Sequence, residues 1–339
     1  MPEACPRGVG TSKKPCFLGR GGTCLPVMVS EESGETLFST DSEPHMNRVI
    51  FGNNLDHLPL IESESVDLIY IDPPFNTGKK QTRAFTRSAR DEEGGDRIGF
   101  KGRRYSTSTT VSRAYADRFD DYLGFLELRL VEAHRVLKQT GTLYFHIDYR
   151  EVHYCKILLD SIFGRDNFIN EIIWAYDYGA RATKRWPAKH DNILMFAKCA
   201  DSFRFNTDEI DRIPYMAPGL VGPEKAARGK LPTDTWWHTI VSPTGKEKLG
   251  YPTQKPLGIL SRIVCASSPP GGLVLDFFAG SGTTGEAALK HGRRFLLIDE
   301  HAEAIGVMKR RFAGNPNVSF EQCESIAPAK SLRENFAAR

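Results

Sequence analysis

The apolar run Val66–Ile71 constrains the fold of this chain more than any other stretch. Its continuous apolar character is typical of a strand buried on both faces of a parallel sheet. Asp72, Pro73, Pro74 and Phe75 follow at once, where the carboxyl ends of such strands present groups to a ligand. Two consecutive prolines fix φ and remove two backbone donors, so the turn is stiff and presents mainly acceptors. This set suits an exocyclic amine on a stacked planar ring, although a proline-rich turn with Asp72 as a helix cap fits the same residues.

A second stretch, Leu273–Gly285, has the pattern of a strand, a glycine turn and the start of a helix. Its glycines let the backbone approach a ligand closely, and the helix start offers free N–H groups. The next strand, Arg294–Ile298, ends in Asp299 and Glu300, and Asp299 follows Gly280 by 19 positions. That interval is close to the roughly 20 residues at which an acid meets a ribose hydroxyl in nucleotide-binding βαβ units. The turn lacks both the dinucleotide fingerprint and the P-loop ending.

Together, the stretches Asp72–Phe75 and Phe277–Gly282 resemble the catalytic and cofactor motifs of DNA amino-methyltransferases that use S-adenosylmethionine. The catalytic motif comes first, which is the permuted order of the beta class. Thr253–Pro256, which reads Thr-Gln-Lys-Pro, resembles the Pro-Thr-Gln-Lys-Pro signature of that class. The resemblance extends over roughly Asn47–Cys323, and three motifs in a fixed order are far more specific than any one of them.

The resemblance implies a doubly wound, seven-stranded Rossmann-like α/β sheet that is circularly permuted and carries an irregular target-recognition insertion. It implies that Asp72, Pro73, Pro74 and Phe75 are catalytic and that no metal is needed. Asn53 departs from the Gly-Asp that is usual near the cofactor's adenine, but an amide can still bond a ring edge. The implied cofactor-binding residues are Asn53, Thr253, Gln254, Lys255, Pro256, Asp276, Phe277, Ala279, Gly280, Ser281, Gly282, Thr283, Asp299 and Glu300.

Composition and periodicity, together with the resemblance, divide the chain into five regions. Residues 1–45 and 324–339 are expected to be disordered tails. Residues 46–198 form the catalytic half of the domain, and residues 253–323 form the cofactor-binding half. Residues 199–252 lose periodicity, and the resemblance implies that they form the target-recognition region; an irregular lid without base contacts is the less favoured alternative.

Apolar periodicity predicts the regular elements of the two halves. The predicted helices are 55–61, 122–137, 151–163, 255–268 and 301–312, and the predicted strands beyond those above are 48–51, 142–147, 168–174 and 192–196. His146 and His190 lack partner motifs and are interpreted as structural. Trp174 and Tyr176 could wall a base pocket or fill the core.

Residues 79–118 are predicted to form a basic loop that contacts DNA. Between Lys79 and Arg113 the chain has 10 Lys or Arg and 4 Asp or Glu, while the net charge of the whole chain is only +3. Positive charge directly after the catalytic motif suits a phosphate backbone. A solvated insertion without a role is the alternative. The candidate DNA-binding residues are Lys79, Lys80, Arg83, Arg103 and Arg104.

Composition limits the compartment and the partners. The chain of 339 residues has no apolar run near the ~18 residues of a membrane span, and no signal peptide is expected. Seven cysteines without Cys-x-x-Cys pairs indicate a reducing cytoplasm, and nothing near Cys5, Cys16 and Cys24 supports a zinc site. Double-stranded DNA is the expected partner. A homodimer and a cognate restriction endonuclease both remain open.

The implied reaction is methyl transfer from S-adenosylmethionine to an exocyclic amine of a base flipped out of duplex DNA. Phe75 would stack on the base, while Asp72 and the Pro73 carbonyl would accept the amine hydrogens. Adenine N6 is favoured over cytosine N4, because the family usually has Asp at this position for adenine and Ser for cytosine. No Pro-Cys nucleophile motif appears in a catalytic setting, which disfavours methylation at cytosine carbon 5.

Three alternatives remain at this point. A related enzyme could act on RNA or on a protein glutamine, but such enzymes usually have Asn at position 72 and lack the permutation. Cytosine N4 could be the target amine. A DNA-binding module could keep the fold without activity, which the intact Asp72 and Gly280–Gly282 disfavour.

Overall fold

The computed structural model describes residues 47–76, 79–90, 97–98, 104–117, 119, 121–178, 182–242 and 244–322. The predicted tails 1–45 and 324–339 lie outside these residues, as does Arg103. Among the described helices, none has the length and apolar character needed to cross a membrane.

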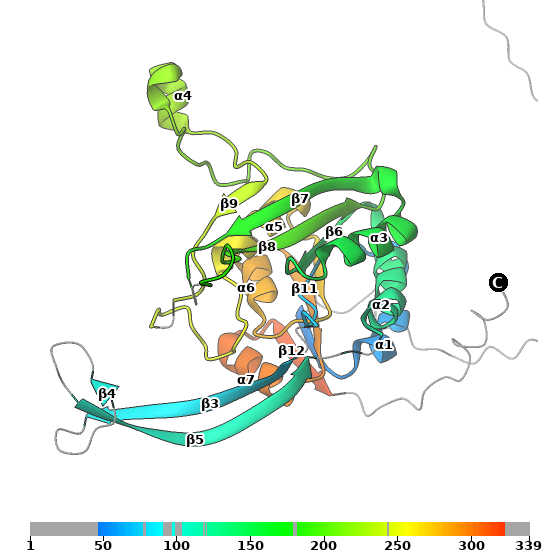
Figure 1. The fold of residues 1–339 in the computed structure, drawn as a ribbon. Helices are drawn as coiled ribbons and strands as arrows, with labels where there is room; N and C mark the ends of the chain where they lie inside the picture. Colours follow the sequence, from blue (N-terminus) through cyan, green and yellow to red (C-terminus); the bar gives the residue numbers. More distant parts are fainter. Residues whose placement is uncertain are drawn as a thin grey trace, which may run out of the picture. The chain divides into compact units, whose positions relative to one another are not determined.

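A mixed sheet of nine strands forms the centre of the domain, in the order β12-β1-β11-β10-β2-β6-β8-β7-β9 (Figure 1). The strands are β1 (Asn47–Phe51), β2 (Val66–Ile71), β6 (Leu137–Ile147), β7 (Phe168–Ala175), β8 (His190–Ala197), β9 (Thr235–Trp237), β10 (Leu273–Asp276), β11 (Arg294–Asp299) and β12 (Val318–Gln322). The β6–β8 and β7–β8 pairs are antiparallel, and the other neighbours are parallel.

Helices cover both faces of this sheet (Figure 1). They are α1 (Asn54–His57), α2 (Tyr122–Val136), α3 (Val152–Phe163), α5 (Leu257–Ser267), α6 (Thr283–Lys290) and α7 (Ala302–Arg311), with 3-10 turns at Leu58–Leu60, Arg165–Asn167 and Pro218–Leu220. The short helix α4 (Pro223–Arg228) has no buried residue and lies away from the sheet (Figure 1). Ile69 and Ile71 of β2 pack in the core that α2 and α3 line, while Leu68 and Tyr70 pack in the core that α5, α6 and α7 line. Alternate side chains of one strand therefore fill two cores, as expected of a doubly wound sheet.

The prediction of seven strands is wrong, because the sheet gains a strand at each edge. β9 has only three residues and lies among the prolines and glycines of the 199–252 region. β12 pairs in parallel with β1, with Val318 opposite Asn47. Arg48 also forms an ion pair with Glu321. Neither short strand carries a periodic signal of its own, since each depends on a neighbour that is distant in the sequence.

The predicted structureless loop 79–118 is also wrong, because most of this segment forms a second sheet of three antiparallel strands. Its strands are β3 (Lys79–Arg90), β4 (Arg97–Ile98) and β5 (Arg104–Asp117), drawn as a long curved ribbon in Figure 1. β3 and β5 pair from Lys79 opposite Asp117 to Arg90 opposite Tyr105. The many Thr, Tyr, Val and Phe residues here favour strands, a preference that the charge pattern obscured. A role of this sheet in DNA binding remains a prediction.

The pairing of β2 with β10 joins the two halves of the chain. Leu68 lies opposite Val274, and Ile69 lies opposite Leu275. Asp67 supports this junction, because its Oδ2 accepts hydrogen bonds from the backbone N–H of Leu273 at 2.9 Å and from Lys138 Nζ at 2.8 Å. A buried side chain near the start of β2 therefore fixes β10 beside it.

We expect Asp67→Ala to lower the free energy of unfolding by about 1–3 kcal/mol, because the buried N–H of Leu273 loses its acceptor. Lys138→Ala is the matched control, since Lys138 is part-exposed and its removal leaves Asp67 bonded to Leu273. The control should lose at most about 1 kcal/mol. Urea unfolding measures both values, and an Asp67→Ala loss no larger than that of the control would contradict this role.

Candidate active site

The turn after β2 is held by side chains from neighbouring elements. Tyr122 of α2 donates its hydroxyl hydrogen to the Pro74 carbonyl at 2.6 Å. Asn76 has a φ of +50°, which is uncommon for a residue other than glycine. Its amide accepts from the Phe119 backbone at 3.1 Å and donates to Glu151 at 3.0 Å. The Asp-Pro-Pro-Phe turn is therefore rigid through its own prolines and through its surroundings.

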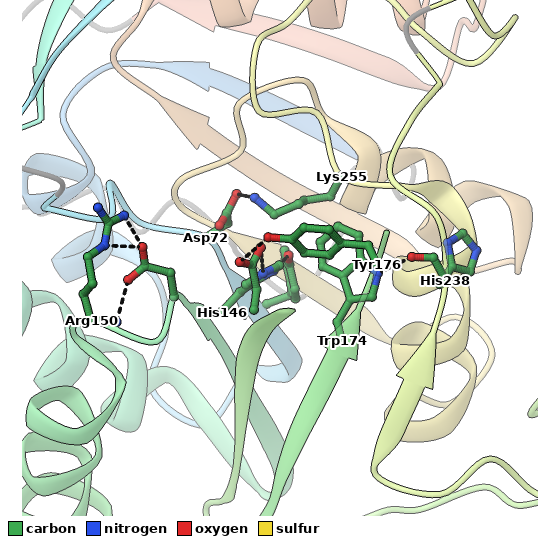
Figure 2. A network of polar contacts seen from close by, with 10 residues as sticks. Asp72, His146, Arg150, Trp174, Tyr176, His238 and Lys255 are labelled. Atoms are coloured by element: carbon green, nitrogen blue, oxygen red, sulfur yellow. Dashed lines mark hydrogen bonds and ion pairs between the residues drawn. The ribbon is translucent and has the colours of Figure 1, made fainter. Parts of the chain in front are cut away.

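The two carboxylate oxygens of Asp72 have different surroundings. Oδ2 forms an ion pair with Lys255 Nζ (Figure 2). Oδ1 is buried, and it has no hydrogen-bond partner among the described residues. Leaving a buried acceptor unpaired costs free energy, so the site is arranged to receive a donor at Oδ1.

Lys255 lies at the catalytic turn, although the sequence placed it with the cofactor residues. Besides its ion pair with Asp72, its Nζ lies 5.1 Å from the centre of the Phe75 ring. The neighbouring Gln254 is buried and bonds the backbone of Glu247 and Leu249. Thr253 is exposed, and Pro256 is buried at the start of α5. The Thr-Gln-Lys-Pro motif thus brings a cation to Asp72, which its position in the sequence did not reveal.

A buried polar network lies behind this pair (Figure 2). His146 Nδ1 lies 2.7 Å from Tyr70 Oη, and His146 Nε2 lies 3.2 Å from Asp191 Oδ2. The Tyr176 hydroxyl donates to Asp191 Oδ1 at 3.1 Å. The His146 ring is 5.9 Å from that of Phe75. His146 is therefore a buried residue with two partners, which agrees with its structural interpretation.

Asp191 was missed by the sequence analysis. Burial raises the pKa of its carboxyl, but the hydrogen bond and charge of His146 and the charge of Lys255 outweigh this effect, and the pKa lies below its ordinary value. Asp191 thus joins the electrostatic environment of the Asp72 pair. No sequence motif indicates Asp191, because its partners come from strands that are distant in the sequence.

The cofactor turn needs its glycines and is clamped by Asp299. Gly280 and Gly282 have φ values of +51° and +74°, a region that disfavours other residues. A Cβ at Gly282 would lie 2.7 Å from Met308 Cγ. Asp299 Oδ2 accepts from the Gly280 N–H at 2.7 Å, and Oδ1 accepts from the His301 N–H at 2.8 Å. Both carboxylate oxygens of Asp299 therefore accept hydrogen bonds from backbone N–H groups, while the neighbouring Glu300 is exposed.

Asp276 begins this turn and is buried at the end of β10. It accepts hydrogen bonds from the Phe278 N–H at 3.0 Å and from Thr284 Oγ1 at 2.6 Å. Burial raises the pKa of Asp276 to about 7, and the charges of Asp72 and Asp299 act in the same direction. Asp72 and Asp276 also raise the pKa of Tyr70, after the larger effect of burial. The site is therefore rich in negative charge and suits a cationic ligand.

The remaining predicted cofactor residues shape the site from behind. Phe277 is fully buried, and its carbonyl accepts from Asn54 Nδ2 at 2.8 Å. Asn53 caps α1 by accepting from the Leu55 N–H at 2.9 Å. Ala279, Ser281 and Thr283 are buried, with the two hydroxyls 3.0 Å apart.

The candidate DNA-binding residues Lys79, Lys80 and Arg83 lie on β3, and Arg104 begins β5.

Two buried arginines that support this half of the site were also missed. Arg129 of α2 donates to Asn54 Oδ1 at 2.7 Å, and Asn54 in turn holds the carbonyl of Phe277. Arg311 of α7 donates to the Ser281 carbonyl at 2.7 Å. Burial lowers the pKa of each guanidinium to about 10. Neither residue belongs to a motif, since each acts through a contact with a distant segment.

A doubly wound sheet with an acidic turn after β2 and a glycine turn after the adjacent strand β10 is typical of α/β enzymes that bind a nucleoside-type cofactor. The chain matches the DNA methylase family (N6_N4_Mtase) over residues 66–310 and belongs to that family. It is therefore a DNA methyltransferase that acts on an exocyclic amine.

A curated relative agrees with this assignment, and solved structures share the fold. DNA adenine methyltransferase YhdJ of Escherichia coli (strain K12) is 31% identical over 296 residues, which cover 84% of this chain and 88% of YhdJ. The structure of the cytosine-N4-specific PvuII DNA methyltransferase aligns with a TM-score of 0.54 and 16% identity, over 80% of this chain and 88% of that one. The M1.HpyAVI–SAM complex aligns with a TM-score of 0.50 and 19% identity, over 78% of this chain and 99% of that one. At these identities the structures show the fold alone.

The raised pKa of Asp276 predicts a pH-dependent stability. Protons bind Asp276 more tightly in the folded state, so its contribution is complete below about pH 4 and is lost as the pH rises through about 7. The Asp276→Asn variant keeps an acceptor for Phe278 and cannot ionise. Relative to this variant, the wild-type protein should lose about 1–3 kcal/mol of unfolding free energy between about pH 5 and pH 8. Urea unfolding at both pH values measures the difference, and a constant difference would show that Asp276 does not titrate in this range.

Proposed function

We propose that this protein transfers a methyl group to the N6 amine of adenine in duplex DNA, after the base has been flipped out of the helix. S-adenosylmethionine is the methyl donor, and it supplies a methyl group on a sulfonium that leaves as a neutral thioether. The observation that carries the proposal is the buried, unpaired Oδ1 of Asp72 at the end of β2. An amine hydrogen is the donor that this oxygen lacks.

The chain's own groups would activate the amine by orienting it. Asp72 Oδ1 and the Pro73 carbonyl each accept one amine hydrogen, which turns the nitrogen lone pair out of conjugation with the ring. The new N–C bond places positive charge on the nitrogen, and the carboxylate stabilises that charge. The nitrogen then loses one proton, for which Asp72 is the adjacent acceptor. Phe75 provides a flat surface for the base.

Lys255 and the acidic residues would balance charge during this reaction. The ammonium of Lys255 compensates the charge of Asp72, which lies among other acidic groups. A cationic cofactor would bring further compensation to Asp276 at the glycine turn. The exposed Glu300, or Asp299 after a change of partner, would bind the ribose hydroxyls.

Adenine is favoured over cytosine by the carboxylate and by the relatives. An ionised Asp stabilises a developing ammonium better than a hydroxyl does. YhdJ, a relative that matches most of the chain, is named as an adenine methyltransferase. The likeness to a cytosine-N4 enzyme concerns the fold. We further propose that the basic residues of β3 and β5 contact DNA phosphates and that residues 199–252 read the target sequence.

The experiment is to methylate unmodified duplex DNA with labelled cofactor, digest it to nucleosides and identify the product by mass. We expect label in N6-methyladenine. Label only in N4-methylcytosine would contradict the choice of base, and DNA without label would contradict the proposed reaction on DNA.

The Asp72→Ala variant serves as the mechanistic control in the same assay. It should transfer methyl groups at least about 10²-fold more slowly, because it loses the group that stabilises the developing charge. Its affinity for the cofactor, measured by calorimetry, should change less than about threefold, because Asp72 acts on the amine. Retained turnover with lost cofactor affinity would reverse these roles.

A further inference from the structure

Trp186 is among the most exposed of the large apolar side chains that the structure describes. Its side chain is 94% exposed and that of Trp237 is 78% exposed, while Trp174 and Trp236 are buried. Exposure of a single apolar side chain is common in folded proteins, so the case for a partner of Trp186 rests on its place in the fold and on the charges around it.

The topology of the sheet places the segment that carries Trp186 at the same end of the strands as Asp72, which follows the carboxyl end of β2. β7 ends at Ala175 opposite His190, the first residue of β8, so residues 176–189 connect these strands at one edge. β8 is antiparallel to β6, with Asn192 opposite Ile147. β6 is parallel to β2, so this edge is the one at which β2 delivers Asp72.

Contacts confirm that the base of this connection reaches the active site. Tyr176, the first residue after β7, donates to Asp191, and Asp191 contacts His146. The centre of the His146 ring lies 5.9 Å from the centre of the Phe75 ring. The connection that carries Trp186 thus starts within two side chains of the catalytic turn.

The residues around Trp186 are basic and restrict its backbone. Lys184 and Arg185 precede Trp186, and Lys189 follows it. Pro187 comes directly after Trp186 and disfavours a helical conformation at Trp186. The Lys189 ammonium donates to the Tyr178 carbonyl at 2.6 Å, which closes this part of the connection. Positive charge on both sides of an exposed aromatic ring matches a polyanion whose interior is a stack of flat rings.

We infer that Trp186 enters the base stack of the DNA duplex and fills the space left by the flipped target base. This inference rests on the proposed function, because it supplies the step that base flipping requires. A flipped base leaves a gap and an unpaired partner, and an inserted apolar side chain restores the stacking on both sides. Lys184 and Arg185 would hold the adjacent phosphates and set the depth of insertion.

The test compares Trp186→Ala with Phe205→Ala on two DNA duplexes. Phe205 is a matched control, because it is an aromatic side chain with 49% exposure. It lies at the opposite end of the strands, because the N–H of the neighbouring Arg204 donates to the Thr140 carbonyl near the start of β6. One duplex carries a site that the wild-type protein methylates. The other duplex carries the same site with an abasic position opposite the target base.

On the intact duplex, Trp186→Ala should lower kcat/KM by about tenfold or more, the effect expected from one lost stacking contact. On the abasic duplex the loss should shrink to less than about threefold, because the target base is already unpaired. Phe205→Ala should stay within about twofold of the wild type on both, and Trp186→Phe should recover most of the activity.

A wild-type rate in Trp186→Ala on the intact duplex would overturn the inference. An equal loss on both duplexes would overturn it as well, since it would show a general binding contact in place of a wedge. A wild-type protein that methylates no DNA would instead refute the proposed function. Thermal unfolding should be unchanged in each variant, because neither side chain is buried.

Discussion

The pairing of β2 with β10 is the constraint on which the rest of this structure depends. These parallel strands come from opposite ends of the chain, and Leu68 and Ile69 lie opposite Val274 and Leu275. Parallel neighbours end at the same edge, so Asp72 and the glycine turn after Asp276 must lie close together. The effect of Asp72 on the pKa of Asp276 reflects this closeness. The catalytic motif and the cofactor turn become one site through this ladder.

Charge is the second organising feature of the site. Several acidic side chains gather at one edge of the sheet, and burial raises the pKa of Asp276 to about 7. Lys255 compensates Asp72 directly and also lowers the pKa of Asp191. Such a site favours ligands that carry positive charge, and it stabilises a reaction in which positive charge passes from sulfur to nitrogen. In the proposed reaction, Asp276 would compensate the charge of the cofactor, while Asp72 would stabilise the charge that develops on the amine.

Much of the fold and the outline of the site could be predicted from the sequence, because local signals agree with it. Helix α2 spans Tyr122–Val136 against a prediction of 122–137, and the strand β2 is fully buried as its apolar run indicates. What failed depends on distant contacts or on competing signals. Strand β12 forms because it pairs with β1. The many charged residues of 79–118 obscured the strand propensity of that segment. Lys255 contacts Asp72 although the two residues are 183 positions apart. Asp191 acquires its role only through His146.

The most direct measurement is a crystal structure of the protein bound to a DNA duplex and to a non-reactive analogue of the cofactor. The duplex contains the sequence that the protein methylates, with the target base unmodified. We predict a flipped adenine whose N6 lies within about 2.6–3.2 Å of Asp72 Oδ1 and of the Pro73 carbonyl, a hydrogen-bonding distance. The analogue should occupy the Asp276–Gly282 turn. An exocyclic amine held by other groups, with Asp72 bonded only to Lys255 or to the cofactor, would contradict it.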